Sequence, residues 1–247
     1  MKNAIIRYIP NIDFRASEAI NTLATNITFT GNDTKCIQLT SCREHEGKSA
    51  LSVMTWKTLA DMGYKTVLID ADLRRSTMKS KYGIRLEGEG TGLSHYLSRN
   101  NIEIDDILYS TNISKAIYIP AGHDVANSMQ LLSNKRLELL IEKLKAEYDY
   151  ILIDTPPVGA IVDAATVARC CDGALLVVTH NKTTKWEVLN GKEQIEKAGC
   201  PVLGTVLNKV EMTKNSSKYY SRAYYSSYYS NYYSSNEGKK KETRKHD

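Results

Sequence analysis

The sequence has no long hydrophobic run. Among its 247 residues there is no stretch of about 20 consecutive apolar residues, the length needed to span a bilayer, and the first residues do not resemble a signal peptide. The five cysteines are an odd number without a Cys-x-x-Cys spacing, which indicates a reducing compartment. We therefore expect a cytoplasmic protein, and any membrane association must be peripheral or through a partner.

Phenylalanine and tryptophan are scarce, with two of each, whereas tyrosine occurs sixteen times. Eight tyrosines fall within fifteen residues near the C-terminus, as four adjacent pairs separated mainly by serines, with almost no aliphatic residue to anchor them in a core. We expect a disordered tail over residues 214–247 with accessible hydroxyl groups, where each phosphate adds roughly −1.5 to −2 charges. The paired tyrosines are Tyr219, Tyr220, Tyr224, Tyr225, Tyr228, Tyr229, Tyr232 and Tyr233.

Positive charge is concentrated in the same tail. Residues 214–247 carry six Lys and two Arg against two Glu and one Asp, so the tail accounts for the whole formal net charge of +5. A basic tail beside a neutral body suggests a tether to an anionic surface, which phosphorylation would cancel. No nucleic-acid-binding module accompanies these charges, so no nucleic-acid partner is expected. A tail of Tyr/Ser low complexity that is never phosphorylated is the alternative.

The pattern of short apolar runs and helical segments predicts an α/β fold. Because strands and helices alternate, we expect one doubly wound, mostly parallel sheet of the P-loop NTPase type over residues 35–213, preceded by an N-terminal segment and helix over residues 1–34. The expected strands are residues 36–39, 66–69, 116–119, 150–153, 174–178 and 202–207. The expected helices are residues 16–28, 49–62, 134–147, 160–169 and 185–198.

The segment between the first of these strands and its helix ends as a P-loop does, in Gly-Lys-Ser. In such a loop, backbone NH groups surround phosphate oxygens, the lysine reaches the β- and γ-phosphates, and the serine hydroxyl binds Mg²⁺. Cys42 stands where the motif has its first glycine, so the match depends on the last three residues and the strand-loop-helix setting. The expected nucleotide-binding residues here are Arg43, Glu46, Gly47, Lys48, Ser49 and Ala50.

Two acidic motifs follow buried strands. Asp70 and Asp72 end one strand and Asp154 ends another, where a Mg-nucleotide site needs carboxylates beside the P-loop. A single aspartate is often only a helix cap or turn former, and for Asp163 and Asp172 we favour that interpretation. The three motifs together predict a nucleotide site.

At this point the chain resembles the bacterial tyrosine kinases of capsule and exopolysaccharide synthesis, the CpsD/CapB type, which use Walker motifs instead of a eukaryotic kinase fold. The resemblance runs from about residue 13 to residue 208 and continues into the tyrosine cluster. The sequence has no HRD or DFG motif. The matching segments are residues 47–49, 70–75, 91–94, 118–122, 130–133, 148–157 and 204–208.

The resemblance implies an ATP and Mg²⁺ site. Lys48 would neutralise phosphate charge, while Ser49, Asp72 and Asp154 would hold the metal directly or through water. Asn208, at the end of the last strand, would contact the adenine edge.

It also implies how the phosphate is transferred. Asp70 or Asp72 would accept the proton of the attacking tyrosine, and we favour Asp70 as the base and Asp72 on the metal side. Arg74 would hold the carboxylates or phosphates in place. An unperturbed tyrosine pKa near 10 makes such a base necessary at neutral pH.

Partners are implied by the same resemblance. In this family the tail of one subunit enters the active site of its neighbour in a ring, and multiple phosphorylation releases the ring. A transmembrane adaptor of the polysaccharide chain-length family activates kinase subunits of this kind, and a cognate tyrosine phosphatase is expected. The family's first helix carries a Glu-x-x-Arg-x-x-Arg interface pattern, where this chain has Glu18, Asn21 and Ala24, so the usual ring contact is missing.

The phosphate loop also departs from the family. Glu44 and His45 replace the usual Pro-Gly, which predicts weaker ATP binding. Arg43 stands where the deviant Walker ATPases of the MinD/ParA group carry their signature lysine. Such an ATPase, with water as the nucleophile, is therefore the second hypothesis, and a degenerate nucleotide-binding regulator is the third.

Overall fold

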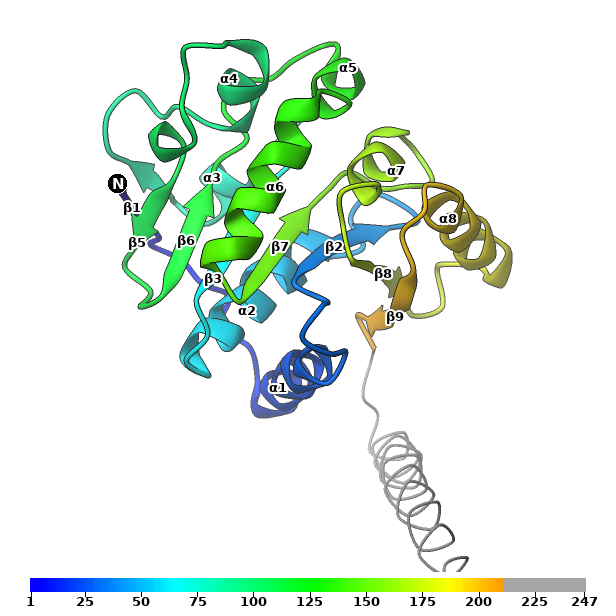
Figure 1. Ribbon diagram of the computed structural model, residues 1–247. Helices are drawn as coiled ribbons and strands as arrows, with labels where there is room; N and C mark the ends of the chain where they lie inside the picture. The colour runs from blue at the N-terminus through cyan, green and yellow to red at the C-terminus, as the bar shows by residue number, and fades with distance from the viewer. Residues whose placement is uncertain (211–247) are drawn as a thin grey trace, which may run out of the picture. The chain divides into compact units, whose positions relative to one another are not determined.

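A mostly parallel sheet forms the centre of the computed structural model, which describes residues 1–210. Its nine strands lie in the order β4-β1-β5-β6-β3-β7-β2-β8-β9 (Figure 1). The pairs β6/β3, β3/β7, β7/β2, β2/β8 and β8/β9 are all parallel, and the antiparallel pairs are β1/β4 and β5/β6. The strands are β1 (Lys2–Ile5), β2 (Cys36–Ser41), β3 (Thr66–Asp70), β4 (Arg85–Leu86), β5 (Tyr109–Thr111), β6 (Ala116–Ile119), β7 (Tyr150–Asp154), β8 (Gly173–Thr179) and β9 (Val202–Asn208).

Helices cover both faces of this sheet, which confirms the predicted doubly wound α/β class (Figure 1). Three of them begin at a residue whose side chain accepts a hydrogen bond from a backbone NH of the first turn, as at α1, where Asp13 accepts from the NH of Ala16. The helices are α1 (Phe14–Thr28), α2 (Lys48–Asp61), α3 (Met78–Lys81), α4 (Leu93–Ser98), α5 (Ser128–Leu132), α6 (Lys135–Glu147), α7 (Asp163–Ala168) and α8 (Lys185–Lys197), with a 3-10 turn η1 (Ile104–Asp106).

The core lies in two layers because the strand side chains alternate in direction. Leu68 and Leu152 pack with α1 and α2 on one face, around the fully buried ring of Trp56. Ile69 and Ile153 pack with α6 on the other face. Strands buried on both faces explain why the sequence shows continuous apolar runs there instead of alternation.

The parallel register brings three chain segments to one edge of the sheet. Asp70 at the end of β3 lies directly opposite Asp154 at the end of β7. β2, the other neighbour of β7, ends at Ser41, and the P-loop follows it. The two acidic motifs and the P-loop therefore meet at the carboxyl ends of adjacent strands, as the sequence predicts.

All the expected strands are present, each extended by no more than two residues, but the predicted helix over 160–169 begins only at Asp163. It is shorter because the NH groups of Ala160 and Ile161 both turn back to the carbonyl of Pro157. The short strands β1, β4 and β5 were not predicted from the sequence.

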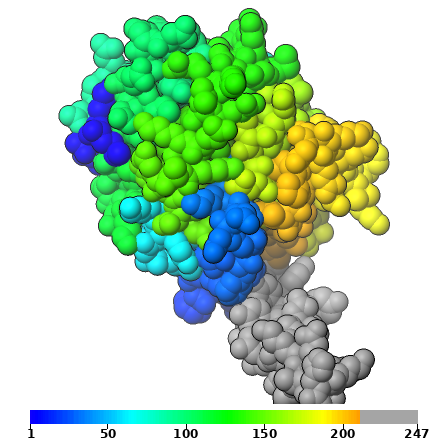
Figure 2. Space-filling model, in the orientation of Figure 1, coloured from blue at the N-terminus to red at the C-terminus, as the bar shows by residue number. Residues whose placement is uncertain are grey.

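The N-terminal residues join the same sheet, since β1 pairs with β4 and β5. The dark-blue start of the chain is exposed beside the teal residues in Figure 2. Residues Met1–Asn208 form one compact unit, and the boundaries at residues 34 and 213 stay predictions. No helix within residues 1–210 has both the length and the apolar character to cross a bilayer.

Candidate active site

The P-loop joins β2 to α2 and is closed by a glycine that no other residue can replace easily. Gly47 caps α2 with φ 92°, in the left-handed region. A Cβ atom added there would lie 2.2 Å from the side-chain nitrogen of Asn208, which donates a hydrogen bond to the carbonyl of Glu46 at 2.8 Å. The end of β9 is thereby packed against the loop, directly before Lys48 and Ser49 begin α2.

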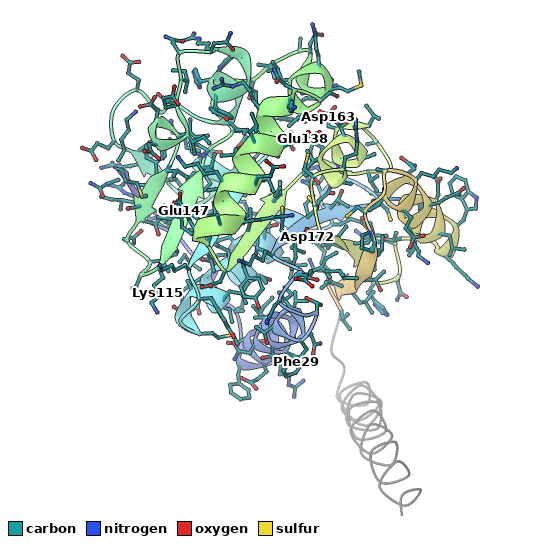
Figure 3. The ribbon with its side chains drawn as sticks, in the orientation of Figure 1. Phe29, Lys115, Glu138, Glu147, Asp163 and Asp172 are labelled. Carbon is teal, nitrogen blue, oxygen red and sulfur yellow. The ribbon has the colours of Figure 1, made fainter. Side chains whose placement is uncertain are left out.

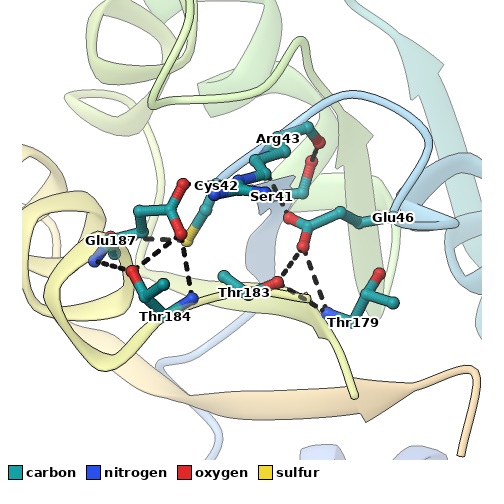
Figure 4. Close-up of polar contacts among 8 residues, drawn as sticks. All are labelled: Ser41, Cys42, Arg43, Glu46, Thr179, Thr183, Thr184 and Glu187. Carbon is teal, nitrogen blue, oxygen red and sulfur yellow. Dashed lines mark hydrogen bonds and ion pairs between the residues drawn. The ribbon is translucent and has the colours of Figure 1, made fainter. Parts of the chain in front are cut away.

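A buried carboxylate braces the loop from inside (Figure 4). Glu46 is only 3 % exposed, and its carboxylate accepts hydrogen bonds from the backbone NH of Arg43 at 2.9 Å and from that of Thr179 at 3.1 Å. The hydroxyl of Thr183 donates to it as well. These bonds turn the carboxylate of Glu46 toward the protein. The backbone NH of Glu46 is therefore the group suited to an anionic ligand.

The two departures from the P-loop pattern have different consequences. Cys42 replaces a glycine at a position without positive φ, and its sulfur packs toward Gly191 of α8, so the substitution adds no backbone strain. His45 does adopt φ 60°, which costs a non-glycine residue on the order of 1 kcal/mol. A glycine at this place would relieve that strain.

Arg43 is held within its own chain. Its guanidinium forms an ion pair with Glu187 in the first turn of α8 (Figure 4). The hydrogen bond from Arg43, followed by those from Thr184, lowers the pKa of Glu187 to about 2, so this carboxylate stays charged at neutral pH. The guanidinium is thereby tied to α8 and not to a residue of the acidic edge.

Asp70 and Asp154 form the acidic centre of the site. They are 1 % and 2 % exposed, and the hydroxyl of Ser52 donates to Asp154 at 2.9 Å. Burial and repulsion from Asp154 raise the pKa of Asp70 to about 7. Burial also raises the pKa of Asp154, while Lys48 and the hydroxyls of Ser49 and Ser52 oppose that change.

This donor set suits Mg²⁺. Two adjacent buried carboxylates repel each other and prefer a cation between or beside them, and carboxylate and hydroxyl oxygens are ligands that this ion accepts. The hydroxyl of Ser49 supplies the third oxygen close to Asp154.

The turn after β3 is ordered around Asp70. The hydroxyl of Ser76 and the backbone NH of Asp72 both donate to the Asp70 carboxylate. The Asp72 side chain accepts from the backbone NH of Arg75 at 3.0 Å. Asp72 is therefore close to Asp70 but is also bonded to its own turn.

Asp163 is more than a helix cap. Its carboxylate is fully buried and accepts two hydrogen bonds from Arg74, at 3.0 and 3.3 Å, and one from the hydroxyl of Ser128. Figure 3 shows Asp163 at the start of α7, whereas Asp172 follows that helix. The interpretation of Asp163 as a simple cap was wrong, because it anchors the arginine of the acidic motif.

Asp172 does behave as a turn former. Its carboxylate accepts from the backbone NH groups of Lys35 and Cys36, at 3.0 and 2.8 Å, and pairs with Lys145. It lies before β8, at the opposite end of the strands from Asp70 and Asp154.

The structure thus brings Lys48, Ser49, Asp70, Asp72 and Asp154 to one edge, as expected. Sequence reasoning missed Ser52, Ser76, Ser128 and the role of Asp163; only Ser52 carried a signal, since it lies one helical turn after Lys48 on α2. The eight paired tyrosines lie outside the described residues.

The first helix differs from the family's interface pattern. The side chain of Asn21 donates to Glu18 at 3.1 Å on the exposed side of α1, while Ala24 is fully buried. Neither Asn21 nor Ala24 offers the positive charge of the arginines in that pattern.

The comparison with known proteins agrees with this geometry. A family model described as an AAA domain matches residues 34–195. The tyrosine-protein kinase CpsD of Streptococcus agalactiae serotype III is 41 % identical over 196 residues, which are 79 % of this chain and 83 % of that protein.

Solved structures show the same relationship. The kinase domain of the Escherichia coli tyrosine kinase ETK is 27 % identical, with a TM-score of 0.75 over 85 % of this chain and 90 % of that one. MinD of Pyrococcus horikoshii, complexed with Mg-ADP, is 24 % identical, with a TM-score of 0.63 over 73 % of this chain and 72 % of that one, a likeness of fold alone. The P-loop fold implies nucleotide binding.

The raised pKa of Asp70 predicts how stability depends on pH. Between about pH 4 and 7 the folded chain keeps a proton on Asp70 that the unfolded chain has lost, so the free energy of unfolding falls as the pH rises through this window. Asp70→Asn should flatten this decline, by on the order of 1–3 kcal/mol, in denaturant titrations with a chelator present. The exposed Asp33→Asn serves as control, and parallel curves for all three proteins would contradict the assignment.

A second prediction concerns Arg74. Removing its guanidinium leaves the buried Asp163 with a hydroxyl as its remaining side-chain partner. Arg74→Ala should lower the free energy of unfolding by about 1–3 kcal/mol, and the neighbouring exposed Arg75→Ala by less than about 0.5 kcal/mol. Equal losses for the two variants, measured by urea unfolding, would show that the Arg74–Asp163 pair does not stabilise the turn.

Proposed function

The chain belongs to the CpsD/CapB family of bacterial tyrosine-protein kinases, and we propose that it transfers the γ-phosphate of ATP to its own C-terminal tyrosine cluster. The biological context is capsular or exopolysaccharide synthesis and export. The observation that carries the proposal is a braced P-loop beside two buried carboxylates, one of which has a pKa near 7. A base with such a pKa accepts protons efficiently at neutral pH.

The phosphates of ATP would lie at the start of α2. There the backbone NH groups of Glu46, Gly47 and Ala50 would bind the phosphate oxygens, and Lys48 would contribute a positive charge. Asn208 would meet the adenine edge, since β9 ends against the loop. Arg43 would contact the nucleotide only after leaving Glu187, so its role in binding is the weakest of this set.

Ser49, Asp72 and Asp154 are the proposed Mg²⁺ ligands, directly or through water. When bound, the ion would neutralise charge on the β- and γ-phosphates. The chain's own part is to keep these oxygens fixed, which Ser52 does for Asp154 and the backbone NH of Arg75 does for Asp72.

Asp70 is the proposed base. It would take the proton of the tyrosine hydroxyl as the phenolic oxygen bonds to the γ-phosphorus and ADP departs with the electrons of the broken P–O bond. Ser76 and the backbone NH of Asp72 orient its carboxylate for this step. Arg74, anchored by Asp163, would keep the motif and the phosphates in position.

The ATPase alternative is weaker. The MinD likeness extends to the fold, and Arg43, which suggested that class, is paired with Glu187 of its own chain. A degenerate regulator is disfavoured by the complete acidic edge.

Partners follow from the family. We propose a transmembrane polysaccharide chain-length adaptor that places the kinase at the inner face of the membrane, and a cognate tyrosine phosphatase. Homo-oligomerisation would proceed without the arginines of the usual ring interface, because α1 presents Asn21 and buries Ala24 instead. No nucleic-acid partner is included.

Mapping of phosphosites after incubation with Mg-ATP tests the function. Phosphate should appear on residues 219–233, with or without the adaptor's cytoplasmic segment. Lys48→Met and Asp70→Ala should each lower its rate by about 100-fold or more, because each removes charge stabilisation or the base.

Lys57→Met is the matched control, since this lysine lies on the same helix but pairs with Asp61 at the surface. A tail that stays unmodified while Lys48-dependent ADP release continues would replace the kinase by the ATPase hypothesis.

A further inference from the structure

A basic groove opens beside the acidic edge, on the side of the short strands β1 and β4. Its volume is about 480 Å³, within the range of ligand sites. The N-terminal segment after β1 forms one wall, and α3 with the start of β4 forms the other. The polar side chains that line it are Arg7, Tyr8, Ser76, Lys79, Ser80 and Arg85.

The charge of this groove is all of one sign. Arg7, Lys79 and Arg85 contribute three positive charges, and none of the lining residues is acidic. Within the part of the chain that the structure describes, none of the three forms an ion pair. Clustered cations without internal partners attract an anion from outside, and arginine offers a phosphate two parallel hydrogen bonds.

The groove is held in shape by the backbone. The NH groups of Arg7 and Tyr8 both donate to the carbonyl of Tyr82, at 3.2 and 3.1 Å. Gly83 has φ 57°, and a Cβ atom there would come within 2.9 Å of the Tyr8 ring. The ring therefore lies against a glycine that leaves room for it, with 64 % of Tyr8 exposed.

One serine connects the groove to the catalytic edge. Ser76 lines the groove, and its hydroxyl donates to the carboxylate of Asp70, the proposed base. A peptide with one side chain in the groove would thus have its neighbouring residues close to Asp70.

We propose that this groove binds a phosphotyrosine of the tail, residues 219–233, that has already been modified, and so presents the next tyrosine to Asp70. The inference rests on the proposed kinase function. Tyr8 offers an aromatic face to the phenyl ring, while Arg7, Lys79 and Arg85 take the phosphate.

The tail itself supports this occupant. Its tyrosine pairs begin four or five residues apart, about 13–18 Å in an extended chain, so a modified pair and the next substrate lie on one short segment. Unmodified, the tail is positively charged and is repelled by a basic groove. A phosphate adds roughly −1.5 to −2 charges at one tyrosine, which gives the groove a local anion to bind and makes it selective for the product.

Peptide binding tests the site directly. The full chain with Lys48→Met, which removes turnover, is titrated with a labelled peptide of residues 214–236, either unmodified or phosphorylated on Tyr228. The phosphorylated peptide should bind about tenfold tighter or more. When Arg7→Gln, Lys79→Gln and Arg85→Gln are added to the Lys48→Met chain, the two peptides should bind with equal affinity.

The matched control is Lys65→Gln, Lys135→Gln and Arg169→Gln, which removes the same number of charges from exposed sites elsewhere. This control should change the affinity for the phosphorylated peptide by less than about twofold. Equal binding of both peptides, or equal losses in the two triple variants, would overturn the proposal. So would groove-dependent binding to phosphatidylserine vesicles without a preference for the phosphopeptide, which would assign the groove to a membrane.

The time course of phosphorylation separates this inference from the kinase function. In dephosphorylated wild-type protein, intact-mass spectra should show unmodified and multiply phosphorylated chains together, because later phosphates enter faster than the first. In the groove variant the singly phosphorylated chain should accumulate, with the first step changed less than about twofold. Identical patterns in the two proteins overturn the groove alone, whereas a wild-type chain that takes up no phosphate overturns the kinase function and the inference built on it.

Discussion

The repulsion between Asp70 and Asp154 is the constraint around which the site is built. The parallel register of β3 and β7 places the two carboxylates opposite each other, and both are buried. Neighbouring groups moderate this cost: Ser76 donates to Asp70, and Ser52 donates to Asp154. Burial, together with the repulsion from Asp154, raises the pKa of Asp70 to about 7, which is the property that a base for a tyrosine hydroxyl needs.

The phosphate loop shows a similar division between what supports the backbone and what faces the ligand. Glu46 uses its carboxylate to tie the loop to the end of β8, and Arg43 is tied to Glu187. With these side chains bonded to protein, the backbone NH groups at the start of α2 and Lys48 are left for phosphate. The loop can therefore tolerate Cys42, whose backbone is relaxed, but carries strain at His45, where φ is positive.

The sequence predicted the central strands and the acidic edge because both depend on local patterns: apolar runs, strand-terminal aspartates and the Gly47-Lys48-Ser49 ending. It did not predict β1, β4 or β5, whose few residues have too little periodicity to identify and which exist because they pair with each other or with β6. The Arg74–Asp163 pair joins residues 89 positions apart, so no spacing rule could reveal it. The basic groove is likewise made by the unpredicted edge.

The groove formed by these edge elements adds a positive field beside the negative field of the acidic edge. The groove attracts a phosphate with three cations, whereas Asp70, Asp72 and Asp154 repel one. The first phosphates on the tail can be held by the groove, but eight would bring roughly −12 to −16 charges, far more than three cations can neutralise. As phosphates are added to the tail, its attraction to the groove must therefore saturate, while its repulsion from the acidic edge continues to grow. Multisite phosphorylation at such a site promotes itself at first and then limits itself, with no second protein needed to stop it.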